Sequence, residues 1–280
     1  MRQAPRQPGV GDRMRTRRSE TPGTANGTAA EAPRLTDIVQ RLEEEIALGL
    51  LRPRERLVED DLLARFNVKR HVVRQVLAEL EMMGMVTRRP NRGAVVRDFT
   101  TLEVEHIYFV RELLERAAVE VMPLPVAPEV AATLERVHAQ HCAAVKAGRL
   151  RDVFRLNLLF HQTFFEACGN GPLTEAISQF AFKAHAIQSY TIANPSLLAR
   201  VCKEHAQFLK LVRGTDRQGL IDLVAKHKQP AKVAYIEVSR RIEGHLEDAA
   251  NMSPSAPAAA TRGKRASGEA SPRPPKSSSP

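Results

Sequence analysis

Long apolar runs and cysteine are both scarce in this sequence. No stretch approaches the roughly 20 apolar residues that a membrane-spanning helix needs, and no apolar segment of the secretory type follows Met1. The three cysteines, Cys142, Cys168 and Cys202, are odd in number, far apart in the chain and set among apolar residues. We therefore expect reduced core thiols in a cytoplasmic protein that has no membrane partner, rather than a disulfide framework.

Acidic residues are also in deficit, with 32 Asp and Glu against 42 Lys and Arg, a formal net charge of +10 and a pI near 9.9. Residues 1–33 hold six Arg and three acids, and residues 251–280 hold five Lys or Arg and one acid. Because both ends are rich in Pro, Ser, Gly, Ala and Thr, we predict disordered basic tails over 1–33 and 247–280. A transit peptide is a weaker alternative for the first tail, which lacks an amphipathic apolar face. The basic balance favours a polyanionic partner.

Strand patterns are confined to one short segment. Residues 34–98 predict three helices and then two short strands around a Pro-Asn-Arg-Gly turn, whereas residues 99–246 predict only helices. In the second segment Pro and Gly separate the helical patterns, which predicts an all-α bundle of six helices. The predicted helices of the bundle lie near residues 101–121, 127–147, 151–168, 173–192, 196–213 and 217–243.

The third predicted helix, near residues 69–83, has an apolar face and a cationic face. At about 100° per residue, the apolar residues of one face point to a core and the opposite face is basic and polar at its start. A short helix and a tight turn precede it, which is the arrangement of a helix-turn-helix whose second helix enters the DNA major groove. Arg can bridge guanine O6 and N7, and Gln can bridge adenine N6 and N7. The apolar face holds Val73, Val76, Leu77 and Leu80, and the outer face holds Arg70, His71, Arg74, Gln75 and Ala78. A solvated basic face is the alternative interpretation, which the turn and the hairpin that follow make less favourable.

Residues 46–96 resemble the winged helix-turn-helix of GntR-family transcription regulators. The motifs I-x-x-G-x-L-x-P, L-x-E-x-x-L, V-R-x-x-L and P-N-R-G-A occur there in the family's order. The resemblance implies a mainly α fold, with a winged helix-turn-helix of three helices and a β-hairpin before the bundle, and binding to double-stranded operator DNA. The DNA contacts that it implies come from Lys69, Arg70, His71 and Arg74 in the helix and from Arg92 and Gly93 in the wing.

Several positions depart from the family's pattern. Arg54 and Asn67 stand where the family has Gly, and Asp60 stands where many members carry a phosphate-binding Arg. Lys69 replaces a Ser or Thr that caps the helix, at a cost of about 1 kcal/mol. His71 and Val72 replace a Thr-Pro pair. We therefore expect DNA binding at an operator that differs from the family's commonest one.

Histidines recur in the helical segment. Asn157 and His161 share a helix face at spacing i, i+4, and His205 and His227 lie on the next-to-last and last predicted helices. A satisfied core histidine is the simpler reading of each alone. Three His and one oxygen donor from three helices of one bundle could instead converge on a first-row metal.

The pattern N-x-x-x-H, G-N, E-H and a later His resembles the FCD effector domain of FadR-type GntR regulators, in the shorter VanR-like group with six helices. That resemblance implies a divalent metal, zinc or nickel, held by Asn157, His161, His205 and His227 beside a cavity for a small organic acid. Asn157 is the weaker ligand because an amide oxygen carries no charge. Arg111 is expected to meet the effector carboxylate or to brace the bundle.

Three functions compete at this point. The first is a homodimeric repressor of transcription, associated with the bacterial nucleoid, that reads a palindromic operator and responds to an organic acid. The second is a helical metal-dependent hydrolase with a basic nucleic-acid-binding appendage, for which Glu204 is the obvious base. The third is a binder that holds nucleic acid through its tails without regard to sequence. We expect the regulator, and therefore no catalytic residues.

Overall fold

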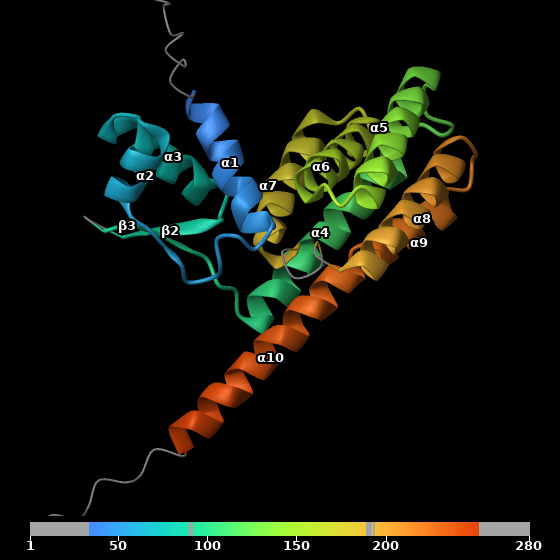
Figure 1. The fold of residues 1–280 in the computed structure, drawn as a ribbon. Coiled ribbons are helices and arrows are strands. Elements are labelled where there is room, and N and C mark those ends of the chain that lie inside the picture. The colour runs from blue at the N-terminus through green and yellow to red at the C-terminus, as the bar shows by residue number, and fades with distance from the viewer. Residues whose placement is uncertain (1–33, 90–91, 189–191, 193, 252–280) are drawn as a thin grey trace, which may run out of the picture.

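The computed structural model describes residues 34–89, 92–188, 192 and 194–251, with side chains as far as residue 241. A small helix-turn-helix part lies beside a larger part built only of helices, and the long α10 (Gln229–Asn251) extends from the helical part (Figure 1). No helix within the described ranges is long and apolar enough to cross a membrane. The predicted first tail and most of the predicted second tail fall outside the described residues, although α10 continues past residue 247, where that tail is predicted to begin.

The N-terminal part is a winged helix-turn-helix, as predicted. Its strands form an antiparallel sheet in the order β1-β3-β2, with Leu57 opposite Ala94 and Thr87 opposite Val95. The apolar face predicted for the third helix is buried in the core of this part. The elements are α1 (Leu35–Ala47), β1 (Arg56–Leu57), α2 (Glu59–Phe66), α3 (Arg70–Met82), β2 (Val86–Arg89) and β3 (Gly93–Val96).

The departures from the family's pattern have local consequences in this part. Asn67 ends α2 in the left-handed region with φ of 50°, a conformation that Asn tolerates better than most residues. Arg54 has φ of 68° at a position where glycine is favoured, and its Nε lies 2.6 Å from Asp98 Oδ2. Lys69 is the N-cap of α3 and makes no capping hydrogen bond through its side chain. The prediction that α3 lacks a side-chain cap is therefore confirmed.

Seven helices form the described C-terminal part, where the sequence predicts six. The difference arises because the predicted helix over 217–243 is divided at Lys228. Pro230, two residues later, lacks the N–H that would donate to the carbonyl of residue 226, which favours a break in the helix here. The helices are α4 (Thr101–Val121), α5 (Pro128–Lys146), α6 (Leu150–Glu166), α7 (Gly171–Gln188), α8 (Pro195–Val212), α9 (Arg217–His227) and α10.

The two parts share one apolar core. Ala184 and Ile187 of α7 and Tyr235 of α10 pack in the same cluster as the core of the winged helix-turn-helix. The hydroxyl of Tyr235 accepts a hydrogen bond of 2.9 Å from the backbone N–H of Phe99, which lies in the connection between the parts. The helical part therefore holds both the body of the DNA-binding part and the connection that leads to it.

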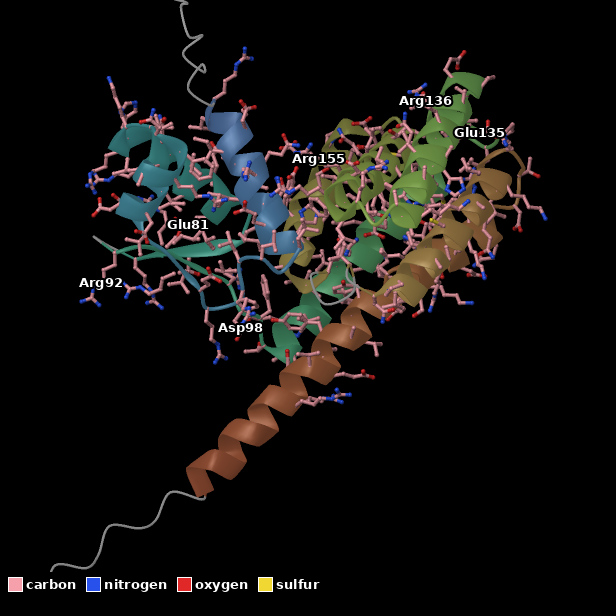
Figure 2. The ribbon with its side chains drawn as sticks, viewed as in Figure 1. Glu81, Arg92, Asp98, Glu135, Arg136 and Arg155 are labelled. Carbon is pink, nitrogen blue, oxygen red and sulfur yellow. The ribbon has the colours of Figure 1, made fainter. Side chains whose placement is uncertain are left out.

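Ion pairs add to this contact along α1. Glu43 Oε1 lies 2.8 Å from His185 Nδ1 of α7, and Glu44 bonds Arg155 of α6. Figure 2 shows Arg155 on the side of the helical part that faces α1. All three side chains of the run Glu43 to Glu45 are buried, which isolated carboxylates avoid. Arg155 of α6 and the imidazole of His185 on α7 lie against two of these carboxylates, so α1 bridges the two parts.

Candidate functional site: the recognition helix and the ligand cavity

The residues predicted to contact DNA lie on one outward face. Lys69, Arg70, His71, Arg74 and Gln75 are all exposed at the start of α3. Arg92 is exposed at the tip of the wing, where Figure 2 shows it pointing away from the molecule. Arg70, Arg74 and Arg92 line one hollow of about 340 Å³ between α3 and the wing. The fold therefore brings the two predicted contact regions together on one cationic surface.

Acids of α2 lie against these arginines. Arg70 Nη2 is 2.7 Å from Asp60 Oδ1, and Glu59 Oε2 is 3.2 Å from Arg70 Nη1 and 3.3 Å from Arg74 Nε. The hydrogen bond with Asp60 is the main reason that the pKa of Arg70 is raised above its ordinary value. Before any DNA binds, two of the predicted contact residues are thus held by carboxylates of their own chain.

Gly93 differs from the other residues of this group because it is buried. Its φ is +78°, and a Cβ atom at this position would lie 2.1 Å from the carbonyl oxygen of Leu57 in β1. Only glycine fits such an approach of two backbones. Gly93 therefore allows the wing to pack closely against β1. A contact of Gly93 with DNA stays a prediction.

Three of the four predicted metal ligands converge in the helical part. His161 of α6, His205 of α8 and His227 at the end of α9 have ring nitrogens that all lie within 4.8 Å of one another. The Nε2 atoms of His161 and His227 are 3.1 Å apart. Two nitrogen ligands of one ion, at metal–nitrogen bonds of ordinary length, lie about 3.0 Å apart in octahedral coordination and about 3.4 Å apart in tetrahedral coordination. The observed distance falls between these two values. Asn157, one turn before His161, lines the cavity on which His161 and His227 open.

Glu204 orients one of these histidines. Its Oε2 lies 2.6 Å from His227 Nδ1, and its Oε1 lies 2.6 Å from Arg200 Nε. Burial alone would raise the pKa of Glu204, but the bonds from His227 and Arg200 lower it below its ordinary value. A carboxylate on Nδ1 places the proton there and leaves the lone pair of Nε2 facing the other histidines, as in metal sites with a carboxylate behind the ligating imidazole.

His205 lacks the hydrogen bonds that a core histidine would need. Both ring nitrogens of His205 are buried and have no hydrogen-bond partner among the described residues. Burial lowers the pKa of His161 and of His205 well below 6.5, so both imidazoles are neutral and offer lone pairs. Unpartnered neutral nitrogens inside a bundle fit a metal ion better than a satisfied core.

A cavity of about 270 Å³ adjoins the histidines. Arg111 lines it and pairs with Glu115 at 3.0 Å, and Lys228 pairs with the same carboxylate at 2.7 Å. Burial alone would lower the pKa of Arg111, but the charge of Glu115 outweighs burial and raises that pKa. For Lys228 burial is the larger effect, and its pKa is lowered. Two cations share one carboxylate here, and Arg111 Nη1 has no hydrogen-bond partner within the described part of the chain. The cavity wall therefore carries excess positive charge, and Arg111 both braces the bundle and faces the cavity.

Sequence reasoning missed several residues of this site. Glu204 appeared only as a base for hydrolysis, although it is the neighbour of His227, and Lys228 was not singled out at all. His185 is buried, lines the cavity and lies against Glu43 of α1. Spacing along the chain cannot predict these pairs, because the two residues of each pair lie on different helices.

Two family descriptions match consecutive parts of the chain. Residues 35–96 match "Bacterial regulatory proteins, gntR family", and residues 106–229 match "FCD domain". The first match covers the winged helix-turn-helix, and the second begins in α4 and ends at the start of α10, so that it includes the histidine cluster and the cavity.

Relatives and solved structures agree with these matches. The chain is 22% identical to the HTH-type transcriptional repressor RspR of Escherichia coli over 192 residues. The matched region covers 69% of this chain and 84% of RspR. It is 23% identical to the HTH-type transcriptional regulator YdhC of Bacillus subtilis over 70% of this chain and 88% of that one. Its fold is similar to E. coli McbR/YncC, with a TM-score of 0.64 and 21% identity over 74% of this chain and 99% of that chain. A GntR protein from Rhodococcus has a TM-score of 0.61, with 18% identity over 73% of this chain and 98% of that chain.

Proposed function

This chain belongs to the GntR family of transcription regulators and carries an FCD domain, and on that basis we propose that it is an organic-acid-responsive repressor. It binds a palindromic operator as a homodimer and holds a divalent metal beside its effector cavity. The matched domains and relatives are regulators and not enzymes, which excludes the hydrolase alternative. Glu204, the base that a hydrolase would need, is already engaged by His227 and Arg200.

Operator reading rests on the outward face of α3 and on the wing. The start of α3, from Lys69 to Gln75, enters the major groove, where Arg74 and Gln75 reach base edges. Arg92 at the wing tip lies on the same surface and reaches the backbone or the minor groove. Lys69 stands at the N-cap of α3 and brings a positive charge there in place of a capping hydroxyl. The base preference of α3 therefore differs from that of family members with a capping hydroxyl at this position.

A dimer is proposed because palindromic operators are read by two copies about one helical turn apart. The surface of α4 supports this proposal. Leu102, Phe109 and Leu113 lie within about 40° of one another around that helix and are 60%, 64% and 53% exposed. Exposure of such a stripe of large apolar side chains to water is unfavourable, and its burial against a second copy would stabilise a dimer.

The metal and the effector share one site. His161, His205 and His227 would hold a zinc or nickel ion, with the Asn157 amide as a fourth donor. A bound divalent ion would supply positive charge and coordination positions for a carboxylate. Arg111 and Lys228 add cationic hydrogen-bond donors on the cavity wall, and its apolar remainder suits a small organic acid.

The cavity is joined to the DNA-binding part through α7. His185 lines the cavity on α7 and pairs with Glu43 of α1, which packs in the core of the winged helix-turn-helix. An effector that prefers one position of α7 therefore shifts the position of α1, and with it the distance between the two recognition helices of a dimer.

One observation carries the proposal: the histidine cluster opens through His161 and His227 on a cavity that the under-neutralised Arg111 also lines. The buried contact of Glu43 with His185 links that cavity to the DNA-binding part. The test is selection of genomic fragments from the source organism by the purified protein, repeated with a panel of organic acids. We expect one palindrome to be enriched and one acid to abolish the enrichment. Fragments without a shared sequence, bound with a steep salt dependence, would instead identify an electrostatic binder without specificity.

Arg111 gives a second test once an acid is found. Arg111→Lys keeps the charge but loses the planar fork, so we expect the acid to bind about 10- to 100-fold more weakly while DNA affinity stays unchanged. Arg116→Lys is the matched control, because Arg116 lies on the same helix but is exposed and pairs with Glu120. Equal weakening in both variants would remove Arg111 from the effector site.

A further inference from the structure

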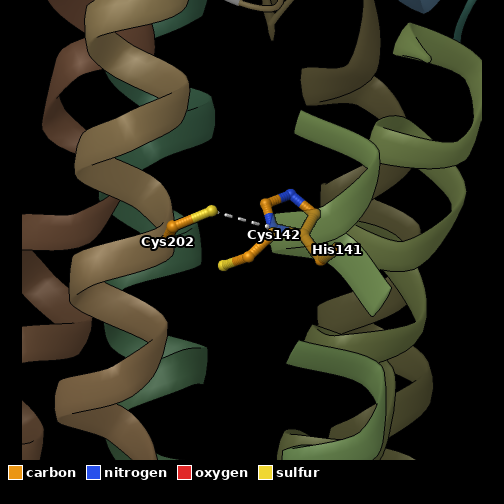
Figure 3. A group of neighbouring side chains, drawn as sticks. All are labelled: His141, Cys142 and Cys202. Atoms are coloured by element: carbon orange, nitrogen blue, oxygen red, sulfur yellow. Dashed lines mark hydrogen bonds between the residues drawn. The ribbon is translucent and has the colours of Figure 1, made fainter. Parts of the chain in front are cut away.

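A second cluster of metal-binding side chains lies between α5 and α8. His141 and Cys142 of α5 face Cys202 of α8 across the gap between the two helices (Figure 3). We call these three residues the thiol site. All three cysteines of the chain are free, but only Cys168 is buried, whereas Cys142 and Cys202 are half-buried. The prediction of core thiols is therefore wrong for these two, which lie where an ion can enter from solvent.

The distances in the thiol site suit a tetrahedral ion. His141 Nδ1 lies 3.6 Å from Cys202 Sγ, and the ligand atoms of all three residues lie within 4.8 Å of one another. With metal–sulfur bonds of 2.3 Å and metal–nitrogen bonds near 2.05 Å, the sulfur–nitrogen edge of a tetrahedron is about 3.6 Å. The side chains need little rearrangement to take one ion between them.

The donors of the thiol site differ from those of the cavity. Two sulfurs and one imidazole prefer soft ions such as Zn²⁺ or Cu⁺, whereas the cavity offers only nitrogen and oxygen donors. His138 is a further donor beside the site, with its Nδ1 3.7 Å from Cys142 Sγ. The two clusters are neighbours, since the rings of His141 and His205 have centroids 5.1 Å apart, but they share no ligand.

From this geometry we propose that His141, Cys142 and Cys202 form a second metal site, which binds a thiophilic d¹⁰ ion, Zn²⁺ or Cu⁺. The bound ion cross-links α5 to α8, the helix that carries His205, and its binding releases the thiol protons. The thiol site does not depend on the proposed effector site. Loss of metal from the histidines would leave the thiol site intact, so the two proposals fail separately.

The test is titration of the reduced, metal-free full-length protein with Co²⁺ under anaerobic conditions. Thiolate-to-cobalt charge transfer absorbs in the near ultraviolet, and the histidine cluster contains no sulfur, so this absorption reports the thiol site alone. We expect it to saturate at one equivalent in His161→Ala and by two equivalents in the wild type, whose histidine cluster also takes up Co²⁺, and to disappear in Cys142→Ser and Cys202→Ser. Cys168→Ser, which removes the remaining thiol, is the matched control and should keep the full absorption.

Two further measurements decide the outcome in the wild-type chain. Zn²⁺ or Cu⁺, each added to the cobalt-loaded protein, should abolish the absorption, and the ion that does so at the lower concentration is the preferred one. Bound metal should also protect Cys142 and Cys202 from alkylation and leave the reactivity of Cys168 unchanged, as read by peptide mass spectrometry. No charge-transfer absorption in a folded, fully reduced protein would overturn the proposal. So would retention of the absorption in Cys202→Ser, or a Cys142–Cys202 disulfide that forms in air while the reduced pair fails to bind metal.

Discussion

Arg70 of the recognition helix is paired with Asp60 of the preceding helix, with Nη2 and Oδ1 2.7 Å apart. Glu59 holds Arg70 and Arg74 from the same side. In the proposed complex these arginines meet DNA, so the phosphates and base edges would compete with carboxylates of the protein itself. The ion pairs hold the arginines in fixed orientations, which would favour DNA binding, but they must also be broken before the arginines contact DNA, which would weaken it. The affinity for DNA shows which effect is larger.

We predict that Asp60→Asn raises the affinity for operator DNA roughly two- to five-fold, because an exposed ion pair contributes little stability and its loss frees Arg70. Fluorescence anisotropy with a labelled operator measures the change. Asp61→Asn is the control, since it removes the same charge from an exposed neighbour for which the described residues offer no ion-pair partner. A gain of the same size in both variants would assign the effect to net charge and not to the pair.

Glu204 should govern metal affinity from behind His227. Glu204→Gln is expected to weaken zinc binding about 10- to 100-fold, because the amide no longer fixes the imidazole tautomer that faces the other histidines. Competition with a chromophoric chelator gives the affinity. Glu135→Gln, a matched change on the surface of α5 where Glu135 pairs with Arg213, should leave it unchanged. Unaltered affinity in Glu204→Gln would mean that His227 does not ligate through Nε2.

Stability of the metal-free protein should fall on acidification. The native pKa of His141 is lowered to about 4 by burial, and burial also lowers those of His161 and His205 well below 6.5. The unfolded chain, with histidine pKa near 6.5, therefore binds more protons than the native chain between pH 6.5 and about 4. The free energy of unfolding in urea, measured with a chelator present, should decrease through this window.

The slope of that decrease identifies its source. His205→Gln removes one of the titrating groups and should flatten the pH dependence, whereas His71→Gln, at an exposed position of α3, should not. An unchanged slope in His205→Gln would show that this histidine is not a source of the acid sensitivity.

The buried pair of Glu43 and His185 should transmit effector binding. Glu43→Gln is expected to leave the affinities for DNA and for the organic acid nearly unchanged when each is measured alone. The factor by which the acid lowers DNA affinity, which is about 5- to 150-fold in typical allosteric proteins, should shrink toward one. Glu129→Gln, an exposed change at the start of α5, is the control. Full coupling in Glu43→Gln would assign transmission to another contact between the parts.

Gly93 should be far less tolerant of alanine than a second glycine with similar backbone. Gly148→Ala places a side chain in open space at φ of +66°, so it should cost about 1 kcal/mol, the strain of a left-handed residue alone. Gly93→Ala adds a clash with the carbonyl of Leu57 and should cost about 2–4 kcal/mol. Urea unfolding compares the two, and similar losses would show that the wing can shift away from β1.

Local features of this fold follow from the sequence alone. Helical periodicity predicts the buried face of α3, with Val73 and Leu80 as members. The motif order identified the winged helix-turn-helix and the FCD domain. These features can be predicted because they depend on neighbours within a few positions of the chain.

Relations between helices were decided by the tertiary structure. Spacing placed Asn157 one turn from His161, but only packing brought His205 and His227 to them and set Glu204 behind His227. The pairing of Asp60 with Arg70 and of Glu43 with His185 also depends on the angles and separations at which helices pack. Those are set by side-chain volumes across a whole core, which no single stretch of sequence contains. The same packing turned Cys142 and Cys202, sixty residues apart in the chain, into half-buried neighbours.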